Sequence, residues 1–171
     1  NTAFVGFGAG GRIYNAPIIA SVPELRITKI LSSNPESIKV AENSYPEAVV
    51  VKSYSEILED PQIDLVVITT PNQLHKEYAE KALKAGKHVV VEKPITTSSR
   101  EAEDLIRIAE ENARVLSVNH NRRWDSDIRT IKKLLKEKRL GEVVEYEAHF
   151  DRFRPELKES WKEKKENPGN G

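Results

Sequence analysis

The sequence predicts an α/β fold, in which a doubly wound parallel sheet is followed by the start of a truncated α+β second domain. Three observations support this prediction: short apolar runs alternate with helical patterns, a glycine-rich turn follows the first run, and the pattern changes after Val118. Such alternation is typical of βαβ units with helices on both faces of a parallel sheet. We therefore expect a first domain over residues 1–121 and the beginning of a second over 122–171.

Six apolar runs are the candidate strands, and they cover residues 3–7, 27–31, 48–51, 65–68, 88–91 and 115–118. Helices are predicted between them from their end signals. Asn34 before Pro35 and Asn72 before the next helical face are N-cap candidates, and Gly86 is a stop signal. Ser98 and Glu101 have the spacing of a capping box. Pro17 lies inside the first helical pattern and predicts a kink or a restart, with Asn15 as the cap.

The pattern after Val118 predicts one more helix and one more strand. Ile128, Ile131, Leu134 and Leu135 share a helical face that Gly141 closes, and residues 144–150 alternate apolar and polar side chains. The 50 residues from 122 to 171, with these two elements alone, bury a sheet face poorly. We therefore expect a second domain that begins near Arg122 and continues beyond Gly171.

Composition narrows the classes of partner. Lys+Arg and Asp+Glu each number 27, so nothing favours a nucleic acid or an anionic membrane. Cysteine is absent, the four histidines lack paired spacing, and no metal site is expected. No apolar stretch approaches the roughly 20 residues of a membrane span. We expect a cytoplasmic protein.

The glycine-rich turn predicts a dinucleotide site. Gly6, Gly8 and Gly11 form Gly-x-Gly-x-x-Gly between a buried strand and a helix. In this motif the first glycine permits a tight turn, the second admits a pyrophosphate, and the third lets the helix pack closely on its strand. The alternative is a glycine turn with a structural role alone.

The end of the second strand bears on the choice of cofactor. NAD enzymes usually carry Asp or Glu there, about 20 residues past the glycines, to bind the ribose 2′-hydroxyl. This chain has Ser32, Ser33 and Asn34, with Arg12 after the glycine turn and Lys39 one helical turn on. We expect NADP in preference to NAD. The alternative is that Ser33 and Asn34 only cap the next helix.

Several ordered motifs together resemble the Gfo/Idh/MocA oxidoreductases over nearly the whole chain. They are Gly6–Gly11, Thr70-Pro71-Asn72 with His75, Gly86–Val89, Glu92-Lys93-Pro94 and Asn121–Asp125. Residues 120–125 and 152–156 are most similar to the NADP-dependent scyllo-inositol dehydrogenase branch. The resemblance implies a Rossmann domain and a second domain whose open sheet supports substrate binding and a homo-oligomer.

The resemblance also implies roles for individual residues. Lys93 would be catalytic, because a lysine can polarise a hydroxyl and take its proton. The implied cofactor-binding residues are Gly6, Phe7, Gly8, Gly10, Gly11, Arg12, Ser32, Ser33, Asn34, Thr70, Pro71, Asn72, His75, Glu92, Lys93, Asn121 and Arg122, with Arg123 and Trp124 at the substrate. Each of these residues also has a purely structural interpretation. Lys93 would then be a surface lysine before a rigid turn, His75 would bond a loop carbonyl, and residues 122–124 would anchor the joint between the two domains.

The implied reaction is hydride transfer between a nicotinamide cofactor and a hydroxyl or keto carbon of a polyol, sugar or related small molecule. Family members continue into an aspartate and a histidine that would lie beyond Gly171, so the 171-residue fragment is expected to be inactive. Many members have a histidine where this chain has Asn15. Two other classes stay open: a non-catalytic NADP-binding sensor, and a methyltransferase that binds S-adenosylmethionine at the glycine turn.

Overall fold

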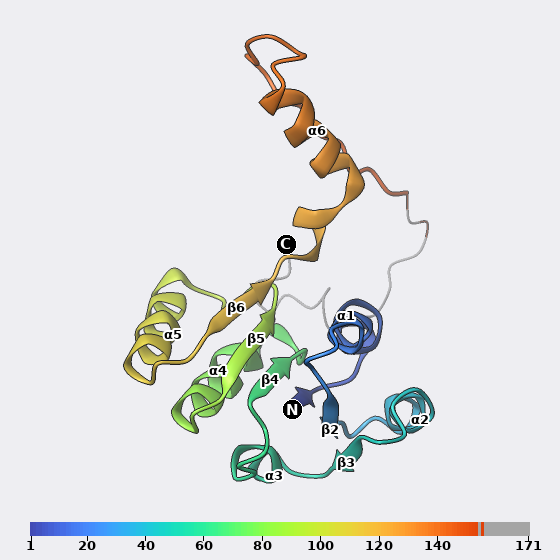
Figure 1. The fold of residues 1–171 in the computed structure, drawn as a ribbon, viewed down its shortest axis with the longest axis vertical. Coiled ribbons are helices and arrows are strands. Elements are labelled where there is room, and N and C mark those ends of the chain that lie inside the picture. The colour runs from blue at the N-terminus through green and yellow to red at the C-terminus, as the bar shows by residue number, and fades with distance from the viewer. Residues whose placement is uncertain (154, 156–171) are drawn as a thin grey trace. The chain divides into compact units, whose positions relative to one another are not determined.

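The computed structural model describes residues 1–153 and 155 (Figure 1). Contacts between Cα atoms divide the described chain into two compact units. The first covers residues 1–119, and the second starts at His120. No helix in the described residues is long and apolar enough to cross a membrane.

The first unit is built on a six-stranded sheet with the order β3-β2-β1-β4-β5-β6. All neighbouring strands are parallel, and Phe4 in β1 pairs with Ile30 in β2 and Val67 in β4. The strands are β1 (Thr2–Val5), β2 (Ile27–Leu31), β3 (Val49–Val51), β4 (Leu65–Ile68), β5 (His88–Glu92) and β6 (Leu116–Asn119). This is the doubly wound order that the alternating apolar runs predict.

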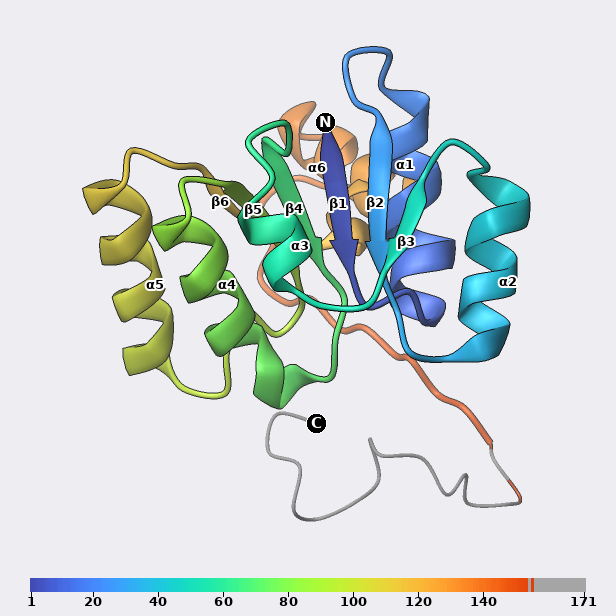
Figure 2. The same ribbon diagram turned by 90° about the horizontal axis from the view of Figure 1, so that it is seen from below.

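Helices cover both faces of this sheet (Figure 2). On one face Val66 and Ile68 pack in a core with α3 (Ser55–Leu58), α4 (His75–Lys84) and α5 (Ser99–Glu111). On the other face Phe4 and Val67 pack in a second core with α1 (Ala16–Ser21) and α2 (Pro35–Ser44). Successive strand residues point to opposite faces, which explains why Val66 and Val67 belong to different cores. Strands buried on both faces read as continuous apolar runs.

Most helix ends follow the sequence signals, with one correction. Asn34 Oδ1 accepts a hydrogen bond from the Ser37 amide at 2.9 Å, and Ser98 Oγ accepts one from the Glu101 amide at 3.3 Å. Gly86 has φ +75° just after α4, as expected of a helix stop. Asn72, however, is not the N-cap of that helix. It is the first residue of the 3-10 turn η2 (Asn72–Leu74), Pro71 precedes that turn, and α4 follows from His75.

The segment before Pro17 confirms the predicted restart of the helix but not the predicted side-chain cap. A π-helical segment, η1 (Gly10–Asn15), runs directly into α1, so Pro17 lies near the start of α1. Asn15 does not cap α1 with its side chain, which is buried. The amides at the start of α1 follow a continuous helical segment and need no such cap.

The second unit contains a turn, a helix and an extended segment. The turn is η3 (Asn121–Trp124), and α6 (Ser126–Lys136) ends five residues before Gly141 rather than at it. The predicted strand over 144–150 does not form: these residues carry no regular secondary structure, and Val144 is 95% exposed. A strand needs a hydrogen-bonded neighbour, and the described residues supply none for this segment. The remaining charged tail lies outside the described residues.

Candidate functional site

The candidate site is the edge of the sheet at which the parallel strands end. Chain connections reverse direction between β1 and β4, the neighbouring strands at the centre of the sheet. In open α/β sheets, ligands bind beyond the carboxyl ends of the strands at this switch point. The ends of β1, β2, β4 and β5 and the segments that follow them carry nearly all the residues that the sequence singles out in the first unit.

The glycine turn is tightly packed against the segment after β4. Gly6 has φ +83°, and a Cβ there would lie 3.0 Å from the backbone oxygen of Thr69. A Cβ on Gly11 would lie 2.8 Å from Thr69 Oγ1 and 3.2 Å from Gly6 O. Thr69 Oγ1 in turn donates a hydrogen bond to Gly6 O at 2.7 Å. The first and third glycines are therefore required by backbone conformation and close packing.

Gly8 differs from these two glycines. It is exposed, and a Cβ built on it would meet nothing within 4 Å. Its lack of a side chain is therefore unexplained by protein packing, and it leaves the backbone open to a ligand. Phe7 beside it is buried, with edge-to-face contacts to Phe4 and Tyr45, so only its backbone can face that ligand.

The end of β2 carries hydroxyl and amide groups and no carboxylate. Asn34 uses its side-chain oxygen to cap α2, and Ser32 Oγ accepts a hydrogen bond from the Asn34 amide at 3.4 Å. Arg12 reaches the first turn of α2, where its Nη1 lies 3.0 Å from Oε1 of Glu36. The structure thus brings Arg12 to the helix that follows the second strand, whereas Lys39 is exposed further along that helix.

His75 joins the segments that follow β4 and β5. Its side chain is completely buried, with Nε2 2.9 Å from Thr70 O and Nδ1 2.7 Å from Pro94 O. A neutral imidazole has one N–H and donates to one of these oxygens, whereas an imidazolium donates to both. His75 therefore bonds loop carbonyls, which was the simpler of its two sequence-based interpretations. Thr70 Oγ1 nearby is buried and finds no hydrogen-bond partner among the described residues.

Glu92 at the end of β5 is held by two amides, while Lys93 is exposed. Oε1 of Glu92 accepts hydrogen bonds from Nδ2 of Asn15 and from Nδ2 of Asn119, each at 2.6 Å. Asn119 Nδ2 also donates to Asn15 Oδ1 at 3.0 Å. Lys93 Nζ makes no hydrogen bond or ion pair with the part of the chain that the structure describes, and the Lys93–Pro94 peptide is cis.

Three of these residues escaped the sequence prediction of the site: Thr69, Asn15 and Asn119. Thr69 and Asn119 each stand at the end of a predicted buried strand, which is a usable signal for a site residue in this fold. Asn15 gave no such signal. It lies 77 residues from Glu92 in the chain, and only the folded structure brings the two together.

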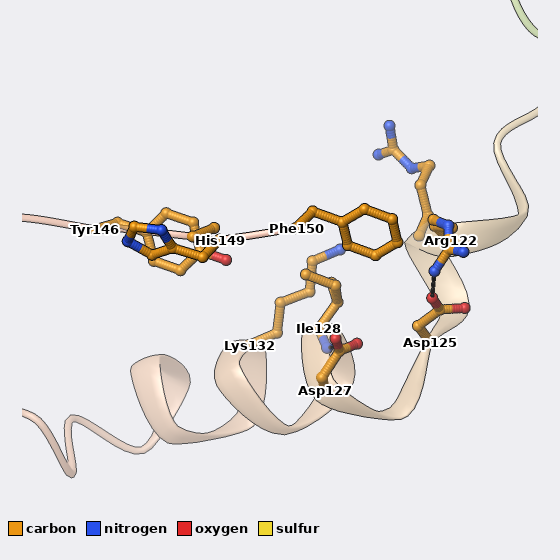
Figure 3. A pocket seen from close by; sticks show the side chains of 10 residues that line it. Arg122, Asp125, Asp127, Ile128, Lys132, Tyr146, His149 and Phe150 are labelled. Carbon is orange, nitrogen blue, oxygen red and sulfur yellow. Dashed lines mark hydrogen bonds and ion pairs between the residues drawn. The ribbon is translucent and has the colours of Figure 1, made fainter. Parts of the chain in front are cut away.

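The candidate residues after β6 lie in the second unit. Asn121, Arg122, Arg123 and Trp124 form η3, and Trp124 is 76% exposed. Within this unit a pocket of about 450 Å³ lies between α6 and residues 146–150, with Arg122 and Arg123 at its wall (Figure 3). Arg122 pairs with Asp125 at 3.0 Å, and its guanidinium lies 5.1 Å from the ring centre of Phe150. The described residues contain no group of three metal-ligating side chains.

Comparison with known proteins identifies the family. The sequence model of the GFO_IDH_MocA oxidoreductases, a family with an NAD-binding Rossmann fold, matches residues 1–120. The chain belongs to this oxidoreductase family. It is 46% identical to the uncharacterized oxidoreductase YdgJ of Escherichia coli strain K12 over 98% of this chain and 47% of YdgJ. It is 43% identical to scyllo-inositol 2-dehydrogenase (NADP(+)) IolW of Bacillus subtilis strain 168 over 94% of this chain and 44% of IolW.

Solved structures agree with the family assignment. The oxidoreductase YPO2259 of Yersinia pestis superposes with a TM-score of 0.87 at 42% identity, over 94% of this chain and 45% of that one. KijD10, a 3-ketoreductase of Actinomadura kijaniata in complex with NADP and TDP-benzene, superposes with a TM-score of 0.72 at 29% identity, over 80% of this chain and 42% of that one. The chain thus spans about half the length of the relatives it matches. The family description, an oxidoreductase with an NAD-binding Rossmann fold, disagrees with the methyltransferase interpretation.

The residues present fit the dinucleotide that this family binds. The open space at Gly8 leaves room for phosphates beside the backbone of the turn that follows β1. This feature agrees with an NAD(P) site at this edge of the sheet.

Proposed function

We propose that the protein containing this chain is an NADP-dependent oxidoreductase acting on a polyol, sugar or related hydroxy or keto compound. The observation that carries this proposal is the exposed Lys93 at the carboxyl edge, between a Glu92 fixed by two amides and a loop that His75 bonds. The relatives that supply the substrate class are the scyllo-inositol dehydrogenase IolW and a 1,5-anhydro-D-fructose reductase of Ensifer adhaerens, which is 31% identical over 71% of this chain and 36% of its own length.

The chain's own residues would divide the work of binding. The loop from Gly6 to Arg12 would receive the pyrophosphate, because helix N-termini and exposed backbone amides attract anions. Thr70, Pro71 and Asn72 would border the nucleotide at the end of β4. Glu92 would accept a hydrogen bond from the nicotinamide ribose. In the second unit, Asn121 and Arg122 would add cofactor contacts, and Arg123 and Trp124 would face the substrate.

Lys93 would act as the general base or acid for the reacting hydroxyl. Oxidation of a secondary alcohol removes a hydride from carbon and a proton from oxygen, and a bound nicotinamide supplies the hydride acceptor. Lys93 Nζ would hydrogen-bond the hydroxyl oxygen and take its proton, and it would return that proton to the oxygen in reduction. Its exposure and its lack of a partner among the described residues leave Nζ available for this contact.

The preference for NADP rests on charge at the end of β2. No carboxylate is present at Ser32–Asn34 to repel a 2′-phosphate, and Arg12 already reaches the first turn of α2. Its partner Glu36 is exposed, and exposed ion pairs contribute only about 0–1 kcal/mol, so Arg12 can exchange Glu36 for a phosphate at little cost. Glu36→Gln should therefore strengthen NADP binding, whereas Arg12→Ala should weaken NADP binding more than NAD binding.

Lys93 is tested by substitution in the full-length protein. Lys93→Ala should lower turnover of polyol and sugar substrates by orders of magnitude with little change in NADP affinity, because Nζ acts on the reacting hydroxyl. Lys81→Ala, an exposed lysine on α4, is the matched control. Near-normal turnover by Lys93→Ala would remove the lysine from the mechanism. A full-length protein that binds NADP but turns over none of a panel of polyols and sugars would favour the non-catalytic sensor.

The second unit would be the start of a substrate and oligomerisation domain. Val144, Tyr146 and Phe150 alternate with polar residues along the extended segment and are exposed, as expected for a strand that lacks its sheet. In a full-length protein, neighbouring strands would cover this apolar face. Size measurement by light scattering on the full-length protein tests the homo-oligomer, and a monomer would contradict it.

A further inference from the structure

The hydrogen bonds around Glu92 saturate one carboxylate oxygen and leave the other free. A side-chain amide has two N–H donors, and a carboxylate only accepts. Asn15 Nδ2 donates to Gly10 O at 2.9 Å and to Glu92 Oε1, while Asn119 Nδ2 donates to Asn15 Oδ1 and to Glu92 Oε1. All four amide N–H groups are therefore used, and Oε2 of Glu92 accepts none of the hydrogen bonds that the described residues make.

Three elements bring these side chains together. Asn15 ends η1 and is 5% exposed, Glu92 ends β5, and Asn119 ends β6, where it is the direct register partner of Glu92. A buried amide that bonds both to the backbone of Gly10 and to a carboxylate cannot turn without losing both bonds. The arrangement therefore fixes the glutamate side chain in one orientation at the carboxyl edge of the sheet.

We propose that Asn15 and Asn119 are positioning residues that act through Glu92, holding its free oxygen Oε2 ready to accept a hydrogen bond from a hydroxyl of the nicotinamide ribose. This inference rests on the proposed NADP binding. Charge-assisted hydrogen bonds are short and strong, and a carboxylate that is already oriented loses less conformational entropy when it binds. Neither asparagine touches the reacting atoms. Their contribution is confined to the nicotinamide half of the cofactor.

The contribution of Asn119 to binding of the nicotinamide half can be measured by comparing the affinities of two ligands. NADP contains both halves of the cofactor, whereas adenosine 2′,5′-bisphosphate contains only the adenosine half with its 2′-phosphate. Asn119→Ala should weaken NADP binding about tenfold while leaving adenosine 2′,5′-bisphosphate binding unchanged, because one oriented hydrogen bond to a charged group is lost. Asn112→Ala, which removes an amide that bonds Ile108 O at the end of α5, is the matched control and should change neither affinity.

The same substitution made in a protein that already carries Glu92→Ala shows whether Asn119 acts through Glu92. In a Glu92→Ala protein, adding Asn119→Ala should cause little further loss of NADP affinity, because the residue that it positions is gone. A merely structural role of Asn119 would lower both affinities alike and would add to the Glu92→Ala effect. Either result would overturn the proposal.

The remaining outcomes distinguish a wrong cofactor from a wrong positioning role. If the wild-type protein binds neither ligand, the proposed cofactor is wrong. If it binds both but Asn119→Ala leaves their ratio unchanged, the positioning role alone is wrong, even if the substrate KM changes. Thermal unfolding accompanies each titration. Should Asn119→Ala not fold, Asn119→Ser, which keeps a polar side chain but removes the amide that bonds Glu92, is titrated instead with the same expected loss of NADP affinity, and failure of both to fold would show a folding residue and overturn the proposal.

Discussion

The glycine turn allows stability and cofactor binding to be separated by the same substitution at two positions. Gly11→Ala would place a methyl group 2.8 Å from Thr69 Oγ1 and 3.2 Å from Gly6 O. Thr69 Oγ1 is already hydrogen-bonded to that same oxygen at 2.7 Å, so it cannot move aside without loss. Gly8→Ala would place its methyl group in open space. We therefore expect Gly11→Ala to lower the stability of the fold and Gly8→Ala to lower the affinity for the cofactor.

The magnitude for Gly11→Ala follows from three contributions. Overpacking costs about 1–3 kcal/mol, and loss of the Thr69 hydrogen bond costs about 1 kcal/mol. The gain in helix propensity from glycine to alanine offsets about 1 kcal/mol of this, because Gly11 lies in a helical segment. The net loss in the free energy of unfolding should be about 2 kcal/mol, which lowers Tm by roughly 8 °C in a domain of this size. Gly8→Ala should change stability by less than about 0.5 kcal/mol.

The affinity for NADP should fall more in Gly8→Ala than in Gly11→Ala. The methyl of Gly8→Ala occupies the space that phosphates need beside the backbone, and losing one charge-assisted hydrogen bond there weakens binding by about tenfold or more. Thermal unfolding by circular dichroism measures stability without ligand, and calorimetric titration with NADP measures affinity. Normal NADP binding by Gly8→Ala would remove the main support for the nucleotide loop. An unchanged Tm in Gly11→Ala would refute the packing analysis.

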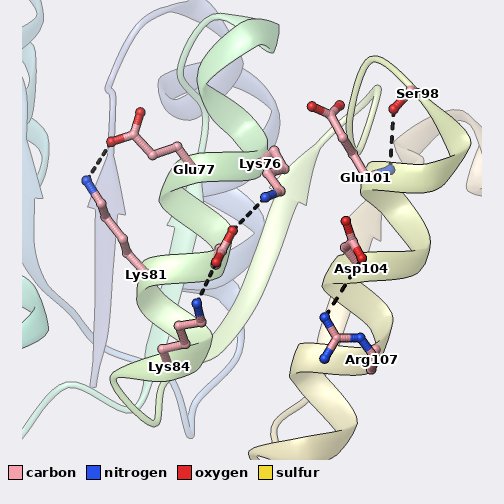
Figure 4. Close-up of polar contacts among 9 residues, drawn as sticks. Lys76, Glu77, Lys81, Lys84, Ser98, Glu101, Asp104 and Arg107 are labelled. Atoms are coloured by element: carbon pink, nitrogen blue, oxygen red, sulfur yellow. Dashed lines mark hydrogen bonds and ion pairs between the residues drawn. The ribbon is translucent and has the colours of Figure 1, made fainter.

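Three further predictions concern side chains of the first unit. Asn34→Ala should lower the free energy of unfolding by about 1 kcal/mol in urea titrations, because the Ser37 amide loses its cap, whereas Ser33→Ala beside it should not. His75→Ala should cost about 3 kcal/mol in the same assay, since it opens a cavity and removes the partner of two carbonyl oxygens; a loss below about 1 kcal/mol would contradict this. Lys76 and Lys84 hold the pKa of Glu80 at about 2, below its ordinary value of 4.5 (Figure 4). The stabilisation by Glu80 is therefore present above the unfolded pKa and should fade from about pH 5 to pH 2, so the difference from Glu80→Gln, about 1 kcal/mol at pH 7, should shrink over that range.

The strands were predictable because a parallel sheet covered on both faces requires continuous apolar runs. Each of the six apolar runs predicted for the first domain overlaps one strand of the sheet, with ends displaced by no more than two residues. The short helix α3 was missed, since four residues are too few for a helical period to show. The alternating segment 144–150 has a strand pattern without a strand. Its alternation of apolar and polar side chains suits a strand with one covered face, and the described residues provide no neighbouring strand for it.

The candidate site was predictable only where it is local in sequence. The glycine turn and Glu92-Lys93-Pro94 are contiguous motifs, and their positions after buried strands placed them on one edge of the sheet. Asn15 was assigned to a helix cap because polar residues before a Pro-containing helix start usually cap it. Its partner Glu92 is 77 residues away, and no periodicity or spacing encodes such a contact. Arg12 was predicted to bind the cofactor because it follows the glycines, whereas its reach to α2 required the folded structure.

Lys93 stands between two residues that are held in different ways, Glu92 through its side chain and Pro94 through its backbone carbonyl. On its N-terminal side Glu92 is held by amides from η1 and β6, and on its C-terminal side the carbonyl of Pro94 bonds the buried His75 at the start of α4. The backbone at Lys93 is thus fixed from both neighbours, while its side chain is exposed. A reacting lysine needs this combination, because the backbone must position Nζ reproducibly while Nζ stays free to meet a substrate hydroxyl. The same combination explains why removal of the Lys93 side chain should leave the fold intact, whereas removal of its buried neighbour His75 should not.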